Sequence, residues 1–317
     1  MTWNVFISSI SKKVPLIKQV RQAMNDLGLG GKLIGGDASP DCIGRFFVDG
    51  FWQMPLLESL TIELFLENCE RFGIKAIIPT RTEELTFFGL YRDILKKHGI
   101  ACLISPLASL EKCLDKLTFS RLLAEWNFPG IPAWEQIDAI DTNCRSYVVK
   151  NRFGAGSREI KLNLSLQEAL SYGKNIQNPL FQPFIEGEEY SVDLYVDQTK
   201  KVKGVLARRR ELVIGGESQV TYSEPIGPLE ELCSSLAEKL ELYGPAVIQV
   251  IRGSEGLWNI IECNPRFGGA STLGIVMGVN SFVWFLLEAL DLSLPPFIRE
   301  RQEKRQVRHP EDWVTDK

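Results

Sequence analysis

The chain has 317 residues, 44% of them hydrophobic and 24% charged, which is the composition of an ordinary globular protein long enough for two domains. The net charge of -4 and the lack of basic runs interleaved with aromatics argue against a nucleic-acid partner. Seven scattered cysteines without a CxxC pair argue against disulfides and zinc and favour a reducing cytoplasm, and two histidines leave little room for His-based catalysis.

Residues 1–108 alternate apolar runs with segments of helical period. The apolar runs read "WNVFISSI", "KLIGGD", "IKAIIPT" and "IACLISP". This alternation predicts a parallel sheet with covering helices, that is, an open Rossmann-like α/β domain. The first turn reads "SSISKK" where a dinucleotide-binding fold would have GxGxxG, so NAD is not expected to bind there.

The pattern changes after residue 106. The segment "SPLASLEKCLDKLTFSRLLAEWNFPGIP" predicts two short helices, with Ser109 capping the first and Lys116 in the second. Strands joined by short turns follow from residue 145 and predict an antiparallel α+β part. The apolar stretch 273–290 contains Gly, Asn, Ser and Glu, so we expect a buried helix and not a membrane span. Residues 301–317 are expected to form a charged, loosely held tail.

The segment "VVKNRFGAGSREIKL" places a Gly-rich loop between two strands. Gly154 and Gly156 can adopt positive φ, and Ser157 lies at the tip of the loop. Successive backbone N–H groups in such a loop can bind an anion, and Lys150 at its edge can neutralise a phosphate. An ordinary hairpin turn is the alternative.

The segment "LFQPFIEGEEYSVDL" predicts a strand, a turn and a second strand. The backbone of Pro183 and Ile185 could meet the edge of a planar base. Alternation places Glu189, Ser191 and Asp193 on one face of the second strand, where a carboxylate could hold a ribose diol. A plain hairpin with a solvated acidic face fits almost as well.

The segment "VLARRREL" alternates in the same way. It places Arg208 and Arg210 on one face of a strand and Arg209 on the other. One of these faces could hold a substrate carboxylate, and a solvated strand edge is the equally good alternative.

The segment "IIECNPRFGGAS" sets Glu262, Asn264 and Arg266 on alternate residues. In a strand such residues share one face. The preceding strand "AVIQVIR" joins this one through "GSEGLW", so a hairpin can bring Gln249 beside Glu262. Oxygen donors from a carboxylate and two amides suit Mg²⁺. A satisfied polar patch on a sheet face is the alternative.

In this order and spacing the motifs resemble those of the ATP-grasp superfamily. "DKLTFSRLLAEWNFPGIP" is similar to its DK…L…GIP helix, "VVKNRFGAGSREI" to its KPxxGxGSxG lid, "LFQPFIEGEEYSVDL" to its QEFIxGxEYSVD hinge and "IIECNPRFGGAS" to its IExNPRxGG metal strand. "IGGDASP" and "IIPTRTEELTFF" most resemble the branch related to carbamoyl-phosphate synthase and the PylC-like amide ligases. The resemblance implies a pre-ATP-grasp α/β domain over 1–108 and an α+β ATP-grasp fold over 109–300, with a lid subdomain to about 185 and a C-terminal subdomain from about 186.

The resemblance also implies the site residues. The implied ATP-binding residues are Lys116, Lys150, Gly154, Gly156, Ser157, Gln182, Pro183, Ile185 and Glu189. The implied ligands of Mg²⁺, or of Mn²⁺, are Gln249, Glu262 and Asn264. The implied catalytic residues are Lys150 and Arg266, the latter for the acyl phosphate or the transition state. Asn151 and Glu159 depart from the lid pattern of the family, which puts lid closure in question.

The implied activity is that of an ATP-dependent carboxylate–amine or carboxylate–thiol ligase, which forms an acyl phosphate on a small-molecule or amino-acid-like acid. Phosphoryl transfer depends on positioning and cations more than on an acid/base pair, which suits a chain with two histidines. Two alternatives stay open: a bicarbonate-phosphorylating subunit like that of carbamoyl-phosphate synthase, and a non-catalytic ATP-binding protein. The acid and the amine stay unidentified, and a homodimer is the base expectation.

Overall fold

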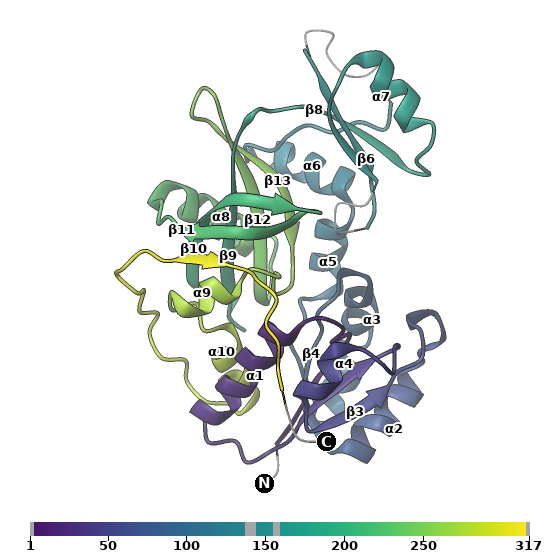
Figure 1. Ribbon diagram of the computed structural model, residues 1–317, viewed down its shortest axis with the longest axis vertical. Coiled ribbons are helices and arrows are strands. Elements are labelled where there is room, and N and C mark those ends of the chain that lie inside the picture. The colour runs from purple at the N-terminus through teal and green to yellow at the C-terminus, as the bar shows by residue number, and fades with distance from the viewer. Residues whose placement is uncertain (1–2, 137–143, 155–158, 315–317) are drawn as a thin grey trace.

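The computed structural model describes residues 3–136, 144–154 and 159–314, which form three sheets (Figure 1). A parallel sheet lies at the bottom of Figure 1, a six-stranded antiparallel sheet in the middle, and a three-stranded sheet at the top. Among these residues, no helix has the length and the apolar character that crossing a membrane would require.

The first sheet is parallel, with the strand order β3-β2-β1-β4-β5, which confirms the predicted Rossmann-like architecture. Its strands are β1 (Asn4–Ile7), β2 (Leu33–Asp37), β3 (Gly50–Gln53), β4 (Ile74–Ile78) and β5 (Ala101–Cys102). Its helices are α1 (Val14–Asp26), η1 (Ile43–Phe47), η2 (Leu57–Ser59), α2 (Ile62–Phe72), η3 (Thr82–Glu84), α3 (Leu85–Leu90) and α4 (Arg92–Lys97). The strand order reverses between β1 and β4, and in open α/β sheets the loops after such strands border the ligand crevice.

The six-stranded sheet has the order β13-β12-β9-β10-β11-β14. Its strands are β9 (Gly187–Val196), β10 (Val202–Ile214), β11 (Glu217–Ser223), β12 (Gly244–Gly253), β13 (Trp258–Asn264) and β14 (Arg305–Val307). One face of the sheet, with Tyr190, Val192 and Leu194, packs on α5 (Leu107–Leu114), α6 (Lys116–Glu125) and α8 (Gly227–Lys239). Because side chains alternate along a strand, Glu189, Ser191 and Asp193 face the other way.

The third sheet has the order β7-β6-β8, and we call it the lid sheet. Its elements are β6 (Tyr147–Asn151), β7 (Ile160–Leu164), α7 (Leu166–Gly173) and β8 (Pro179–Pro183). Tyr147, Val149 and Phe181 make a small separate core with α7. Helix α7 begins at a capping box, in which Ser165 accepts from the backbone N–H of Glu168 and the Glu168 carboxylate accepts from that of Ser165.

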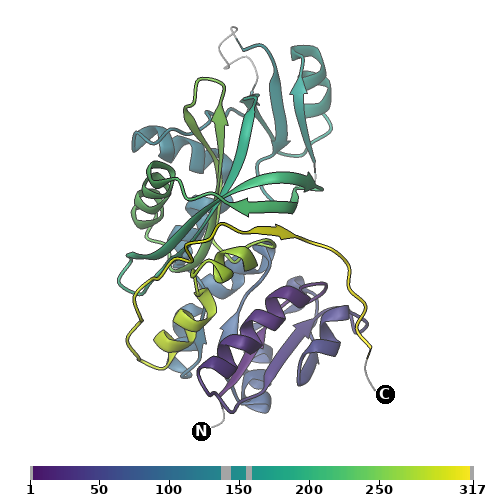
Figure 2. The same cartoon turned by 60° about the vertical axis from the view of Figure 1, so that its left-hand side comes forward.

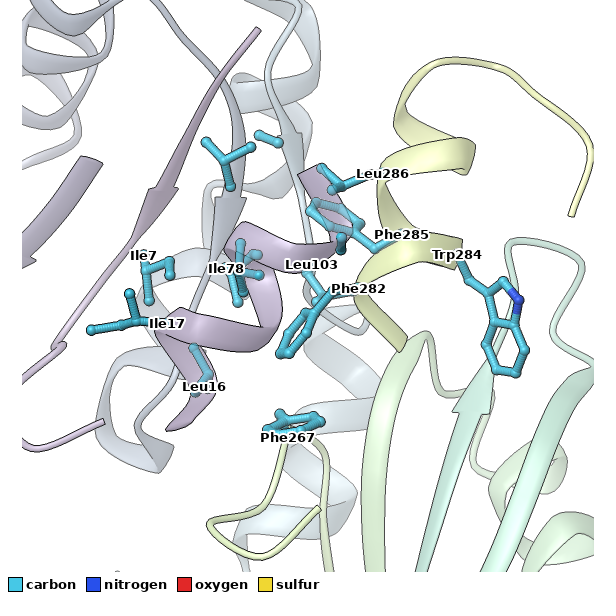
Figure 3. Close-up of a cluster of buried hydrophobic side chains, with 14 of the residues drawn as sticks. Ile7, Leu16, Ile17, Ile78, Leu103, Phe267, Phe282, Trp284, Phe285 and Leu286 are labelled. Carbon is cyan, nitrogen blue, oxygen red and sulfur yellow. The ribbon is translucent and has the colours of Figure 1, made fainter. Parts of the chain in front are cut away.

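An apolar core joins the first sheet to the six-stranded sheet. Helix α10 (Ser281–Ala289) follows the short α9 (Thr272–Val276) and lies beside α1 (Figure 2). Phe282 and Phe285 of α10 share one buried cluster with Leu16 and Ile17 of α1 and with Ile78 of β4 (Figure 3). The two sheets therefore hold a fixed relation to each other through packed side chains.

Two predictions are wrong. Ser109 does not cap α5, which begins after Pro106; its hydroxyl donates instead to the backbone carbonyl of Glu241, 3.0 Å away. Residues 301–317 are not held loosely throughout, because Arg305–Val307 pairs with β11 as strand β14 and the Trp313 ring lies 4.6 Å from that of Phe47. The free edge of β11 offers backbone hydrogen bonds to residues 305–307, and this pairing prevails over the tendency of a charged segment to stay in solvent.

We expect Phe285→Ala to lower the free energy of unfolding by about 3–5 kcal/mol, because the side chain is fully buried between α10 and α1 and its loss leaves a cavity. Phe46→Ala is the matched control, because that ring is 62% exposed, and it should change the free energy by less than about 1 kcal/mol. Urea unfolding measures both. Equal losses would contradict the shared core.

Candidate functional site

A cavity of about 920 Å³ opens between the lid sheet and the polar face of the six-stranded sheet. Its volume lies within the range of small-molecule sites. The predicted site residues that line it are Lys116, Lys150, Gly154, Gln182, Pro183, Ile185, Glu189, Gln249, Glu262, Asn264 and Arg266. Gly156 and Ser157 lie outside the described residues. The structure thus brings together predicted site residues that lie as far apart in the chain as Lys116 and Arg266.

Three oxygen-bearing side chains from β12 and β13 lie next to one another on the polar face. Gln249 is the direct cross-strand partner of Glu262, so the predicted hairpin and its register are confirmed. The Asn264 amide donates to the Glu262 carboxylate at 2.8 Å. One carboxylate with two amides is a hard donor set that fits Mg²⁺ together with phosphate oxygens.

Two lysines line the cavity with these donors. Lys150, near the end of β6, is 6% exposed, and burial lowers its pKa to about 8, against the opposing effect of the Glu262 carboxylate. Lys116 begins α6, and its ammonium group donates to the backbone carbonyl of Gly154 at 2.8 Å. Burial also lowers the pKa of Lys116. Both cations are thereby partly stripped of water, which strengthens their attraction to an anion.

An ion pair fixes the lid loop to the start of α6. Asp115 caps that helix, accepting the backbone N–H of Leu117 at 3.0 Å, and it also accepts the Arg152 Nε–H at 2.7 Å. Burial alone would raise the pKa of Asp115, but hydrogen bonds from Arg152 and Thr118 hold it at about 2. This pair was not predicted from the sequence, although an Asp directly before a helix is a common capping signal.

The two departures from the family lid pattern pair with each other. The Asn151 amide donates to the Glu159 carboxylate at 2.7 Å, and both residues line the cavity. Glu159 adopts φ of +47°, in the left-handed region. The carboxylate is therefore tied to the base of the lid hairpin by a neutral donor.

The hinge between lid and central sheet is the end of β8. This strand is an edge of the lid sheet, and Pro183 and Ile185 line the cavity beyond it. The Gln182 side chain is buried, and its amide donates to the backbone carbonyl of Ile131 at 3.1 Å. A planar ligand at this edge would therefore meet backbone groups of Pro183 and Ile185, with Gln182 bracing the strand from behind.

Glu189 lies on β9 next to the hinge and is paired. Its carboxylate accepts from Arg210 at 2.7 Å, and Arg210 also donates to the Ser218 hydroxyl and the Gly216 carbonyl. The predicted common face of Glu189 and Ser191 is confirmed, because both line the cavity. Arg210 thus holds the Glu189 carboxylate in one orientation at the cavity wall.

The first sheet contributes to the far end of the cavity. Arg266 donates to the Thr82 hydroxyl at 2.9 Å and to the Phe267 carbonyl at 3.1 Å. Burial lowers the pKa of Arg266, and the carboxylates of Glu262 and Glu83 oppose this shift. Thr82 and Glu83 belong to η3 after β4, and Glu83 lines the cavity. Sequence reasoning did not assign these two residues, because no local motif indicates a contact across 184 positions.

The segment after β14 forms another part of the same wall. Arg308 pairs with Glu217 of β11 at 2.6 Å, and both side chains line the cavity. The sequence analysis missed this contribution because it placed residues 301–317 in a solvated tail.

Comparison with known proteins identifies relatives of this arrangement. Residues 175–312 match the family model described as ATP-grasp in the biosynthetic pathway with Ter operon. The carbamoyl phosphate synthase large chain of Clostridium acetobutylicum is 27% identical over 194 residues, which make up 55% of this chain and 18% of that protein. This chain thus matches less than a fifth of that relative's length. The predicted resemblance to ATP-grasp proteins and to carbamoyl-phosphate synthase is confirmed.

Solved structures agree on the fold. The biotin carboxylase from Campylobacter jejuni, in a β-γ-ATP complex, has a TM-score of 0.75 at 15% identity, over 97% of this chain and 76% of that chain. The L-amino acid ligase from Bacillus licheniformis has a TM-score of 0.69 at 17% identity, over 91% of this chain and 74% of that chain. At such low identity these likenesses show the ATP-grasp fold alone.

We expect Asp115→Asn to lower the free energy of unfolding by about 1 kcal/mol and Asp115→Ala by about 2 kcal/mol, because Asn still caps α6 whereas Ala removes both the cap and the partner of Arg152. Urea unfolding at neutral pH measures the two losses. Equal losses would contradict separate contributions of the helix cap and the ion pair to the stability.

The same pair predicts a pH dependence. The pKa of Asp115 is lowered from 3.8 to about 2, so its stabilising effect is complete above pH 4 and is lost as pH falls through 2. The stability difference between wild type and Asp115→Asn should therefore shrink as pH falls from 4 towards 2. A constant difference over that range would contradict the lowered pKa.

Proposed function

We propose that this chain, whose fold is that of the ATP-grasp superfamily, is an ADP-forming ligase that joins the carboxylate of a small-molecule or amino-acid-like acid to an amine or a thiol. The observation that carries the proposal is one cavity in which Glu262 and its two amide neighbours share the wall with Lys116 and Lys150. Burial lowers the pKa of both lysines and the Glu262 carboxylate partly opposes this shift, so the three charged groups lie within electrostatic reach of one another.

The donor set fits a divalent cation. Gln249, Glu262 and Asn264 would hold Mg²⁺, or Mn²⁺, as oxygen ligands. When bound, such an ion neutralises charge on the ATP phosphates. The lysines supply the rest of the positive charge, which supports ATP binding at this wall and not at the first turn of the Rossmann-like sheet.

The remaining residues supply orientation. The base would lie against the backbone of Pro183 and Ile185, and Arg210 holds Glu189 towards the ribose. Lys116 and Lys150 would contact the phosphates together with the lid loop. Holding both reactants in place and neutralising charge provide most of the rate enhancement of phosphoryl transfer.

The reaction follows from this placement. An oxygen of the acid's carboxylate attacks the γ-phosphorus, the bond to the β–γ bridging oxygen breaks, and ADP leaves with that electron pair. The amine then attacks the acyl carbon, phosphate leaves, and the nitrogen gives up a proton to form the amide. Arg266, oriented by Thr82, would meet the negative charge that develops on the acyl group.

A bicarbonate-phosphorylating subunit is the second candidate, favoured by the 27% identity to a carbamoyl phosphate synthase large chain. Such a subunit would need a partner for the later steps. For either function we place the chain in the cytoplasm, since its cysteines are free and all but Cys144 are buried. A homodimer stays a prediction.

Glu262→Gln should abolish ADP release from Mg·ATP, because it removes the one carboxylate of the donor set. ADP release is followed with pooled carboxylic acids, pooled amines and bicarbonate, each omitted in turn. Glu255→Gln is the matched control, because Glu255 is exposed in the turn between β12 and β13, and it should keep wild-type turnover. Undiminished turnover in Glu262→Gln would refute the metal assignment. ADP release that depends on bicarbonate alone would favour the second candidate. Nucleotide binding without any ADP release would favour a non-catalytic protein.

Lys150 should make nucleotide affinity depend on pH. Its pKa is lowered to about 8, so its charge is lost as pH rises from 7 to 9. Titration calorimetry should show Mg·ADP binding weakened about tenfold over that range. Lys150→Arg, which keeps its charge, should show a flat profile. A wild-type profile that is flat as well would contradict a phosphate contact from Lys150.

A further inference from the structure

Arg208 lies in the same row of the central sheet as the proposed metal ligands. Gln249 pairs with Glu262 on one side and with Ser191 on the other, and Ser191 pairs with Arg208. These four residues occupy β13, β12, β9 and β10 in turn, and all four line the cavity. Two strand spacings, about 10 Å, separate the backbones of Arg208 and Gln249, so the long Arg side chain shares their part of the cavity.

The Arg208 guanidinium is fixed along one edge. Its Nε donates to Asp193 Oδ2 at 2.6 Å and its Nη2 to Oδ1 at 3.4 Å. Asp193 also accepts the Ser271 hydroxyl at 2.5 Å, and that hydroxyl accepts the backbone N–H of Gly268 at 3.0 Å. The guanidinium is thus held by a chain of contacts that leads to the segment just after Arg266.

The remaining nitrogen of this guanidinium has no partner among the described residues. Arg208 is 3% exposed, and its Nη1 is buried without a hydrogen bond to any residue that the structure places. Buried polar groups are nearly always satisfied, and an unmet donor on a charged group is especially costly. Arg208 lines the cavity, so a ligand oxygen that reaches Nη1 there would complete its hydrogen bonds.

The direction of the side chain selects the ligand. Asp193 lies on β9 two residues after Ser191 and is therefore further from the hinge. Its partner on β12 is Val247, and the partner of Val247 on β13 is Asn264. Asp193 therefore draws the guanidinium towards Asn264 and the segment after Arg266, away from the base and the ribose. In the proposed reaction, the acid substrate lies on this side of the cavity, beyond the metal ligands.

We propose that Arg208 Nη1 binds the reacting carboxylate of the acid substrate, and so acts as a second guanidinium beside Arg266 at the acyl group. This inference rests on the proposed ligase function for the identity of the anion. The terminal phosphate of ATP offers the same oxyanion chemistry, and the experiment separates the two sources. Arg209, the adjacent residue, points to the opposite face, where it pairs with Glu188 and stacks on Tyr222.

The main variant is Arg208→Lys, which keeps a cation for Asp193 and removes Nη1. Arg209→Met is the matched control, one residue away and outside this cavity. The first arm loads each protein with Mg²⁺ and adenylyl imidodiphosphate, so that the terminal phosphate position is filled, and titrates acetate against chloride at constant ionic strength. Wild type and Arg209→Met should show an acetate-specific rise in thermal midpoint, and Arg208→Lys should require about tenfold more acetate for the same rise.

The second arm compares the affinities of Mg·ADP and of the imidodiphosphate complex by calorimetry. Their ratio should agree within about twofold between wild type and Arg208→Lys, because a lost carboxylate contact affects neither nucleotide. A tenfold fall in the ratio would assign Nη1 to the terminal phosphate and overturn the proposal. An acetate response that is absent in wild type, or equal in both proteins, would overturn it as well.

A second variant guards against misfolding. The double substitution Arg208→Met with Asp193→Asn removes both buried charges at once, so it leaves no unpaired ion. It should fold cooperatively and also lose the acetate response, and a response as in wild type would refute the site. Both arms are equilibrium measurements, so an Arg208-dependent acetate response together with no turnover of Mg·ATP would reject the ligase and keep the carboxylate site.

Discussion

The alternation of side chains along antiparallel strands is the constraint on which the rest of this molecule depends. On β9, Tyr190 and Val192 enter the core under the sheet, while Glu189 and Ser191 face the cavity. A shift of one residue in register would exchange the two sets and bury the charges without partners. Burial of the apolar face therefore determines which side chains lie on the polar face, and the packing that stabilises the sheet also positions the side chains that line the cavity.

Residues attached to all three sheets bound the cavity, and two junctions hold the sheets together. The lid is held by the Asp115–Arg152 ion pair, by the buried contact of Leu117 with Leu180, and by the backbone hydrogen bonds between Trp134 and Phe181. The first sheet is held by apolar packing between α1 and α10, with the Thr82–Arg266 hydrogen bond at the cavity itself. The lid junction buries fewer apolar side chains than the junction between α1 and α10.

Local patterns predicted the fold and eleven of the residues that line the cavity. The period of two located Glu262 and Gln249 on one face, and the turn-rich link between their strands indicated the hairpin. The contacts that sequence reasoning missed join distant segments: Asp115 with Arg152, and Glu217 with Arg308. Their geometry depends on how helices and sheets pack, which no short motif encodes.

Strand β11 was also not predicted, although Gly215 and Gly216, both at positive φ, form the kind of turn that joins two strands of a hairpin. The strand matters because it receives β14 and, through it, brings Arg308 to the cavity. The strand edge that pairs with Arg305–Val307 was therefore absent from the prediction, and residues 301–317 were expected to be a charged tail.

The bond between Thr82 and Arg266 also bears on how such proteins can recombine in evolution. A chimaera that took its Rossmann-like part from one relative and its catalytic part from another would keep both cores but could lose the hydroxyl that orients this guanidinium. Inheritance of the two parts as a unit would preserve it. The residues around this guanidinium would then change by substitution in place more readily than by exchange of whole domains.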